Sequence, residues 1–363
     1  MGRILASSDR ESHNLNRLNS LFALTLQRSR EGHLPFWKQL AEIASLYFIS
    51  GIGPAYYHYA GFWRREVSWR EKTSHLGTRA YRRFVDSVNP AEYRKLSQNK
   101  IAEKGLLSLF GIPTARFIGL LDASSGQTAG GRPLRNAQEL ARLIGALPMK
   151  RICFKLVEGW RGQGFAAAEI VKIGGEVRLR PLLDKEALSV EQFCADVLRF
   201  GPRSPRLIEE YLEQHPVLAG LNPSSLNTAR LWVYRDADSA PRVVASSLKA
   251  GRAGALVDNS SGALGIPMNC ERGTLKAAIV DSPPARKICP AHPDHGAPIE
   301  GIEVPFWTET QELACRALSV FPGLRFAGID VAILPTGPVI VELNAFPDKE
   351  GQIDCERGVR DFA

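Results

Sequence analysis

Apolar residues recur at helical spacing along the first quarter of the chain. Intervals of three and four positions place such residues on one face of an α-helix. Two sets follow this spacing: Leu18, Leu21, Phe22 and Leu26, and then Leu40, Ile43, Ala44 and Tyr47. We therefore expect residues 1–96 to form a helical N-terminal region.

A stretch of twenty residues without Asp, Glu, Lys or Arg runs from Ile43 to Phe62. It is long enough to cross a bilayer. However, Gly51, Gly53 and Pro54 interrupt it midway, and three tyrosines crowd its second half. We expect two helices around a GIGP turn, packed on the protein or resting at a membrane surface, in preference to a membrane span.

From about residue 97 the pattern changes to short apolar runs separated by helical segments and by glycine- or proline-containing turns. This mixture predicts an α+β fold. We expect strands at 112–121, 151–159, 165–173, 206–212, 230–236 and 242–250, and helices at 100–109, 136–147, 190–200 and 308–320.

Two apolar runs near the C-terminal end flank a PTG turn centred on Thr336 and predict a β-hairpin. Antiparallel pairing about this turn places Asp330 opposite Glu342, and Asn344 lies two residues along on the same face. Two carboxylates this close repel each other unless a cation lies between them. Magnesium with a bound nucleotide fits, because Mg²⁺ takes one or two carboxylates together with substrate phosphates.

A second hairpin is predicted where two apolar runs flank the segment EGWRGQGF, which contains Gly159, Gly162 and Gly164. Glycines let backbone N–H groups close over a phosphate. The segment has neither a GKS nor a GKT sequence, so it is not a Walker loop. Lys155 lies within the apolar run before the loop, where a lysine needs an anionic partner, and Lys100 is a second candidate at the start of its helix.

The net charge of +8 belongs to the N-terminal third of the chain alone. Residues 1–104 contain 17 Lys and Arg against 9 Asp and Glu, whereas residues 105–363 contain 29 of each. A basic run with interleaved aromatic residues occupies 63–84. It is either a solvated helix face or a contact for an anionic surface such as lipid headgroups or a lipid-linked sugar diphosphate. No nucleic-acid-binding motif occurs, so we expect no nucleic-acid partner.

Six cysteines without a CxxC pair, and an N-terminus without an apolar signal-peptide core, predict a reduced cytoplasmic protein. Residues 281–300 contain five prolines and predict an extended loop. Cys289, His292 and His295 in this loop have a spacing that suggests zinc. The alternatives are a substrate-covering loop, in which His292 and Asp294 touch the acceptor, and a plain surface loop.

Taken in order along residues 90–350, these features resemble the ATP-grasp superfamily. The segments LNTARLWV, VDNSSGALGIP, HPDHGAPIEGIEVPFW and GIDVAILPTGPVIVELNAFP are similar to its sugar-transfer-associated family. The resemblance implies an ATP-grasp fold, with two α+β subdomains that clasp ATP, preceded by the helical region. We expect boundaries at 1–96 for the helical region, 97–212 for the small subdomain and 213–363 for the large subdomain.

The resemblance also implies roles for individual residues. Lys100 and Lys155 would hold the phosphates, Glu209 would accept a hydrogen bond from the adenine amino group, and Glu213 is nearest to the ribose. The remaining nucleotide contacts would come from the glycine loop and from Glu210, Tyr211 and Leu212. Asp330, Glu342 and Asn344 would bind one or two Mg²⁺ ions. The candidates for contact with the transferring phosphoryl group or the substrate carboxylate are Arg230, Lys249, Arg252 and Asn259.

The resemblance implies an ATP-dependent ligase that joins a carboxylate to an amine through an acyl phosphate. The substrates would be small molecules, including a sugar acid or a lipid-linked glycan of a surface polysaccharide. The protein would be cytoplasmic, with peripheral contact at the inner face of the membrane through its basic N-terminal region. Two alternatives remain: a kinase on the same scaffold, and an ATP-binding scaffold without turnover.

Overall fold

The structure is a computed structural model and describes residues 21–159, 162–201, 204–258, 262–282 and 285–363. The chain forms two compact units. The helical unit comprises Met1–Ser87 with Asp281–Lys287 and Asp348–Ala363, and the larger unit comprises Val88–Val280 with Ile288–Pro347.

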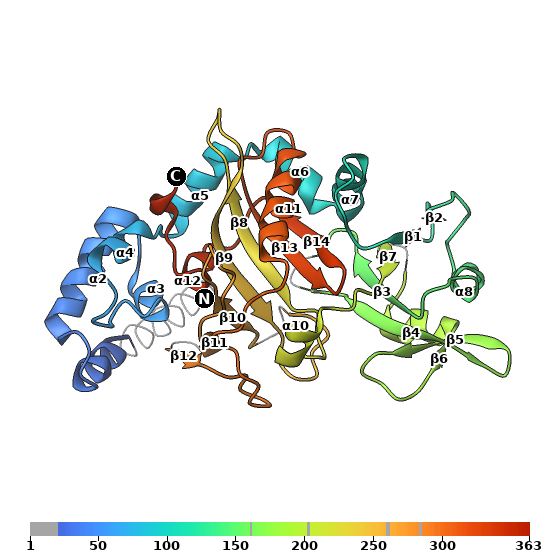
Figure 1. The fold of residues 1–363 in the computed structure, drawn as a ribbon, viewed down its shortest axis with the longest axis horizontal. Coiled ribbons are helices and arrows are strands. Elements are labelled where there is room, and N and C mark those ends of the chain that lie inside the picture. The colour runs from blue at the N-terminus through green and yellow to red at the C-terminus, as the bar shows by residue number, and fades with distance from the viewer. Residues whose placement is uncertain (1–20, 160–161, 202–203, 259–261, 283–284) are drawn as a thin grey trace, which may run out of the picture. The chain divides into compact units, whose positions relative to one another are not determined.

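Short helices build the helical unit (Figure 1). Its helices are α2 (Phe36–Ser50), α3 (Pro54–Tyr59), α4 (Trp69–Ser74), α5 (Thr78–Val88, which ends at the boundary), α12 (Gly351–Asp354) and the 3₁₀ turn η2 (Val359–Asp361). α2 ends because Gly51 adopts φ +68°, a left-handed conformation that glycine reaches without strain. The predicted helix pair around the GIGP turn is therefore confirmed. Within the described ranges, no helix has the length and apolar character needed to cross a membrane.

The first sheet of the larger unit has seven strands and carries the glycine loop. Its spatial order is β2 (Gln127–Thr128), β1 (Phe117–Leu121), β7 (Arg206–Glu210), β3 (Arg151–Leu156), β4 (Ala166–Ile173), β5 (Glu176–Pro181) and β6 (Leu188–Ser189). A hydrophobic core joins this sheet to α8 (Ala137–Gly145), α9 (Val190–Gln192) and the π-helical turn η1 (Phe193–Val197). The predicted helix at 190–200 is thus a short α-helix that continues as a π turn.

The second sheet also has seven strands. Its order is β12 (Ala285–Cys289), β11 (Ala278–Ser282), β10 (Leu264–Pro267), β9 (Arg242–Ala250), β8 (Thr228–Tyr234), β13 (Phe326–Leu334) and β14 (Gly337–Asn344). Part of the predicted extended loop at 281–300 therefore forms the edge strand β12. An edge strand tolerates neighbouring prolines, because one side of it makes no ladder hydrogen bonds.

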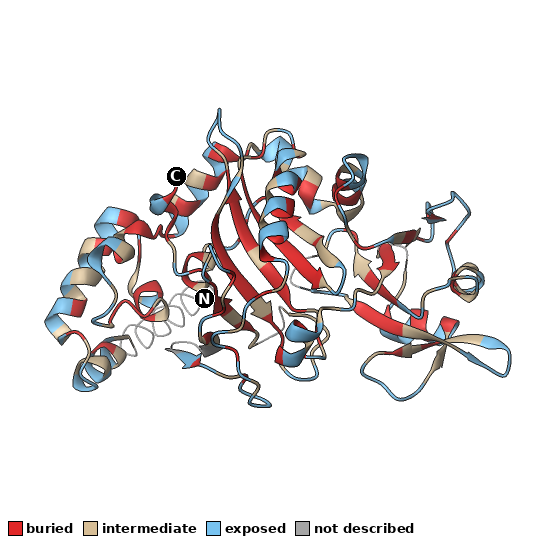
Figure 2. Cartoon of the chain, in the orientation of Figure 1, coloured by how far each residue is buried: buried red, intermediate tan, exposed pale blue. Residues whose placement is uncertain are grey.

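Helix α11 (Trp307–Ser319) packs on the second sheet against β8, β9, β13 and β14 (Figure 1). Nearly every residue of β13 is buried, so this strand lies at the centre of the core (Figure 2). Three further helices complete the larger unit: α6 (Ala91–Gln98), α7 (Lys100–Leu109) and α10 (Pro216–Leu221).

Candidate active site

The carboxylates of the last hairpin face each other. β13 and β14 pair antiparallel with Asp330 opposite Glu342 and Gly328 opposite Asn344. The register predicted from the PTG turn is therefore confirmed at these positions. It shifts by one residue directly after Asp330, which marks a β-bulge, a feature common beside active sites.

Polar residues of β8 and β9 continue the line of this pair across the sheet. Arg230 on β8 pairs with Asp330 on one side and with Ser247 of β9 on the other. We call Ser247, Arg230, Asp330 and Glu342 the polar row. Directly paired residues project to the same face of a sheet. A Cβ atom at Gly328 would lie 3.2 Å from Cδ of Arg230, so a glycine here leaves room for the arginine.

Asp330 is held by two cations. Nη2 of Arg230 donates to its Oδ2 at 2.6 Å, Nε of Arg230 donates to its Oδ1, and Nζ of Lys249 lies 3.8 Å from Oδ1. Burial alone would raise the pKa of Asp330, but the two cations hold it below its ordinary value. Likewise, burial alone would lower the pKa of Arg230, yet Asp330 raises it above its ordinary value. Both side chains therefore remain charged.

Asp258 adds a third carboxylate beside the polar row. It accepts a hydrogen bond from Oγ1 of Thr228, which pairs with Lys249 across β8 and β9. Burial raises the pKa of Asp258 to about 6, against the opposing attraction of Lys249. Asn259, which the sequence also singles out, lies outside the described residues.

Lys100 connects the polar row to the glycine loop. α7 begins at Lys100 because Oδ1 of Asn99 accepts from two backbone N–H groups of the first turn. Nζ of Lys100 donates to the carbonyl oxygen of Gly159 at 2.8 Å and to Oε1 of Glu342 at 3.3 Å. A single ammonium group thus touches both elements to which the sequence assigned phosphate and metal binding.

A second lysine of α7 is a site residue that the sequence analysis missed. Lys104 forms an ion pair with Glu209, and Lys155 lies 2.8 Å from the other carboxylate oxygen of Glu209. Glu209 is fully buried. Burial and the neighbouring charge of Lys155 lower the pKa of Lys104. Lys104 could have been identified from its four-residue spacing to Lys100, because this spacing places both lysines on one helix face.

Glu103 lies next to these lysines and was also missed. It is buried, and its Oε1 accepts the backbone N–H of Leu343 at 3.1 Å. Burial and the nearby charge of Glu342 raise the pKa of Glu103. α7 therefore fixes both β14 and the Glu209 strand through its own side chains.

The glycine loop joins β3 and β4, which pair as predicted. Gly162 and Gly164 adopt φ +69° and +66°. A Cβ at Gly164 would lie 2.5 Å from Nη1 of Arg206, whose guanidinium donates to the Gly164 carbonyl at 2.7 Å. The loop conformation therefore requires glycine at this position.

The predicted adenine segment continues from the end of β7. Glu210 is the last residue of that strand, and Leu212 lies in the irregular segment after it. The backbone N–H of Tyr211 donates to the carbonyl of Arg151 at 3.2 Å, and the Glu213 carboxylate lies 3.2 Å from the Arg151 guanidinium. The segment thus runs beside the first residue of β3.

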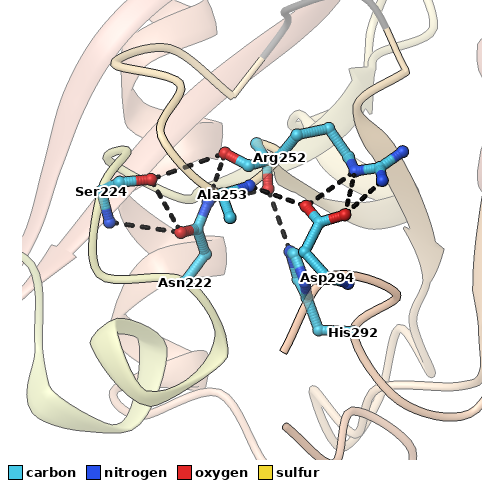
Figure 3. Close-up of polar contacts among 7 residues, drawn as sticks. Asn222, Ser224, Arg252, Ala253, His292 and Asp294 are labelled. Carbon is cyan, nitrogen blue, oxygen red and sulfur yellow. Dashed lines mark hydrogen bonds and ion pairs between the residues drawn. The ribbon is translucent and has the colours of Figure 1, made fainter. Parts of the chain in front are cut away.

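Arg252 is bound to the proline-rich loop (Figure 3). Nε of Arg252 lies 2.8 Å from Oδ2 of Asp294, a second guanidinium nitrogen bonds Oδ1, and the N–H of Ala253 donates to Oδ2 at 2.8 Å. These hydrogen bonds lower the pKa of Asp294. Asp294 therefore occupies one edge of the Arg252 guanidinium.

His292 and His295 stack with ring centroids 4.0 Å apart. His292 is buried, its Nε2 lies 3.1 Å from the carbonyl oxygen of Gly251, and its Nδ1 accepts the backbone N–H of Asp294. Both ring nitrogens thus bond the protein, which does not fit zinc ligation by His292.

The oxygen types of the hairpin are those that Mg²⁺ prefers, and an ion would share Asp330 with Arg230, which donates to both of its carboxylate oxygens. Asp330, Glu342 and Asn344 supply two carboxylates and an amide, and Mg²⁺ completes its shell with water and substrate phosphate oxygens. The cations beside Asp330 keep it ionised, as a ligand must be. Within the described ranges, no three His, Cys, Asp or Glu side chains gather as a metal cluster.

Solved structures similar to this chain include ATP-grasp proteins. An N5-carboxyaminoimidazole synthase from Aspergillus clavatus is 14% identical, with 75% of this chain and 51% of that chain covered and a TM-score of 0.40. The D-alanine-D-alanine ligase from Coxiella burnetii is 11% identical, with 71% and 50% covered and a TM-score of 0.37. The ligase PsnB, complexed with a minimal precursor, is 15% identical, with 77% and 63% covered and a TM-score of 0.36.

The chain therefore spans between about half and two thirds of the length of these proteins. No curated protein matches it. The sequence pattern of the family described as sugar-transfer associated ATP-grasp matches residues 79–362, which is most of the chain and includes the whole polar row. The chain belongs to the sugar-transfer-associated ATP-grasp family.

Proposed function

We propose that this protein is an ATP-dependent carboxylate–amine ligase that works through an acyl phosphate. The observation that carries the proposal is the polar row together with Lys100, which bonds both Glu342 and the glycine loop. These groups supply the carboxylates and cations that phosphoryl transfer requires. In this proposal, residues 97–212 and 213–363 form the two subdomains that hold ATP.

Lys100 and Lys155 hold the phosphates in the proposed complex, under the backbone of the glycine loop. Glu209 receives the adenine amino group. The contacts of Glu209 with Lys104 and Lys155 support this role, because they fix the position of a buried carboxylate. The segment from Glu210 to Glu213 borders the base and the ribose.

The hairpin oxygens would hold Mg²⁺, which neutralises phosphate charge during transfer. A substrate carboxylate oxygen attacks the γ-phosphorus, the bond to the β–γ bridging oxygen breaks, and ADP leaves. Arg230 and Lys249 stabilise charge on the transferring group, and Arg252 orients the substrate carboxylate. An amine then attacks the acyl carbon, a C–N bond forms, phosphate leaves and the amine loses a proton. Positioning and electrostatics supply the rate enhancement.

The family description supports a finer proposal about the substrates. We place the reaction in surface-polysaccharide assembly, where the product is an amide on a sugar acid or an aminosugar. The carboxylate and amine partners are then small molecules or a lipid-linked glycan, and the reaction takes place at the cytoplasmic face of the membrane.

Hydroxylamine trapping tests the reaction class. The protein is incubated with Mg-ATP, pooled sugar acids and amino acids, and hydroxylamine, and phosphorus species are followed by NMR. We expect ADP, free phosphate and a hydroxamate, all dependent on a carboxylate. Glu342→Gln should abolish this turnover, whereas Glu312→Gln on the exposed surface of α11 should leave it unchanged.

Two results would overturn the ligase proposal. A new phosphorylated acceptor without hydroxamate would identify a kinase. ATP binding without turnover under any substrate pool, and with equal affinity in the Glu342→Gln variant, would identify a binding scaffold.

A further inference from the structure

Helix α2 buries polar side chains beside Leu46 on its inward face and exposes large apolar side chains on its outward face. Gln39, Leu46 and Ser50 point into the helical unit and are buried, and Glu42, on the same face, has a side chain only 12% exposed. The opposite face carries Trp37 and Phe48, with the residues between them at the same helical spacing. We call Trp37, Ala41, Ala44 and Phe48 the outer stripe, and all four are exposed.

Gln39 and Glu42 form buried hydrogen bonds that hold this face of the helix inward. Nε2 of Gln39 donates to the carbonyl of Leu34 at 2.6 Å. Glu42 accepts from Tyr57 at 2.8 Å and from Lys72 at 2.7 Å. The helix therefore cannot rotate its outer stripe inward without breaking these buried contacts.

The outer stripe exposes large side chains. Trp37 is 77% exposed and Phe48 is 86% exposed. Tyr47 and Ile49 beside it are also exposed, and exposed residues recur along α2 in Figure 2. From Trp37 to Phe48 the stripe is about 16 Å long at 1.5 Å per residue. Contiguous exposed apolar surface of this kind marks an interaction site.

The neighbouring helical residues 21–30 extend the apolar surface. Phe22 and Leu26 are exposed and lie one helical turn apart. The ring of Phe22 lies 6.5 Å from that of Phe36, which in turn lies 5.1 Å from Trp37. The surface therefore spans two adjacent helices.

Charge on the exposed part of α2 is positive. Lys38 is exposed beside Trp37, and Arg360 donates to the carbonyl of Ile49 at 2.9 Å at the other end of the helix. Glu42, the acidic residue of α2, is neutralised by Lys72. A second copy laid along the stripe in either direction would bring like charges together, whereas an anionic surface complements both ends.

We infer that this face docks on an anionic lipid bilayer, with the outer stripe in the headgroup region and Lys38 and Arg360 on lipid phosphates. Aromatic residues flanked by cations are typical of interfacial helices. The inference concerns the helical unit alone and does not depend on the proposed ligase reaction.

Vesicle flotation of the full-length protein tests the inference. We expect flotation with vesicles that contain phosphatidylglycerol, and weaker flotation with pure phosphatidylcholine or at high salt. The double variant Trp37→Ala/Phe48→Ala should lower the partition coefficient at least about tenfold, because each side chain loses apolar burial. A matched control removes two exposed apolar side chains of the larger unit, one from β4 and one from the turn after β5, in Ile173→Ala/Leu183→Ala, and should float like the unaltered protein.

A second measurement does not depend on the double variant. Bromine-labelled acyl chains quench tryptophans that touch the bilayer, and Trp37→Phe should abolish most of this quenching while preserving flotation. Equal flotation of the Trp37→Ala/Phe48→Ala variant and the unaltered protein would overturn the inference. So would a change from dimer to monomer in that variant without any vesicle binding, since a second copy would then cover the stripe.

Discussion

The ion pair between Arg230 and Asp330 offers the sharpest test of the polar row. Their side chains are only 13% and 11% exposed, and Nη2 of the arginine lies 2.6 Å from Oδ2 of the carboxylate. Arg230→Met keeps most of the aliphatic stem of the side chain and removes the charged guanidinium group. Asp330 is then left buried next to Glu342 without its main partner.

The expected loss of stability follows from this geometry. Removing one partner of a buried ion pair costs about 3–5 kcal/mol. We expect about 3 kcal/mol, the lower end of that range for a broken buried pair, because Lys249 stays near Asp330. Asp330→Asn should cost a similar amount, since it leaves the guanidinium buried. The double variant should lose about 2 kcal/mol less unfolding free energy than the two single variants together, because neither charge is then left buried without a partner.

Urea unfolding followed by circular dichroism measures these values, with Arg316→Met on the exposed surface of α11 as the control. The pH dependence of the stability difference between the two proteins is a second test, because its direction can be predicted. In the unaltered protein the lowered pKa of Asp330 contributes stability that is lost as pH falls. In Arg230→Met, burial raises that pKa, so protonation relieves the cost and the difference between the two proteins shrinks at acidic pH. Additive losses, or a difference that grows at acidic pH, would refute the reasoning.

Three further predictions follow from contacts in both units. Gly164→Ala should cost about 1–3 kcal/mol, because the residue has positive φ and its Cβ would lie 2.5 Å from a guanidinium. Gly254→Ala, also at positive φ but with open space around its Cβ, should cost less in the same urea-unfolding assay. Lys104→Met should weaken ATP binding about tenfold by calorimetry, since the buried carboxylate of Glu209 loses one of its two cations. An equal effect of the exposed Lys95→Met variant would contradict this role. Burial lowers the pKa of His75 to about 3, so its neutral form contributes stability above about pH 6.5 that is lost as pH falls. The drop in unfolding free energy between about pH 7 and pH 5 should be about 2 kcal/mol smaller in His75→Phe, and an unchanged drop would show that this residue does not titrate on unfolding.

Local spacing was sufficient to predict the hairpin that carries the carboxylates. Counting from Thr336 with the period of two in a strand places Asp330 opposite Glu342. The pairs next to the turn are offset by one residue from this count, and the β-bulge after Asp330 restores it at the carboxylates. The glycine-rich hairpin and the helix pair around Gly51 were predicted for the same reason. These features depend on turn chemistry and periodicity within about twenty residues, which a sequence displays directly.

Contacts between distant segments were decided only by the tertiary structure. Arg230 and Asp330 are one hundred residues apart, and their pairing depends on β13 lying between β8 and β14. Lys104 became a site residue because the fold places α7 beside Glu209. The direction in which the side chains of α2 point could also be determined only from the structure. Its composition predicts an apolar helix, but only packing against Tyr57 and Lys72 turns Glu42 inward and leaves the apolar stripe exposed. Periodicity identifies the faces of an element, and its neighbours in space determine which face is buried.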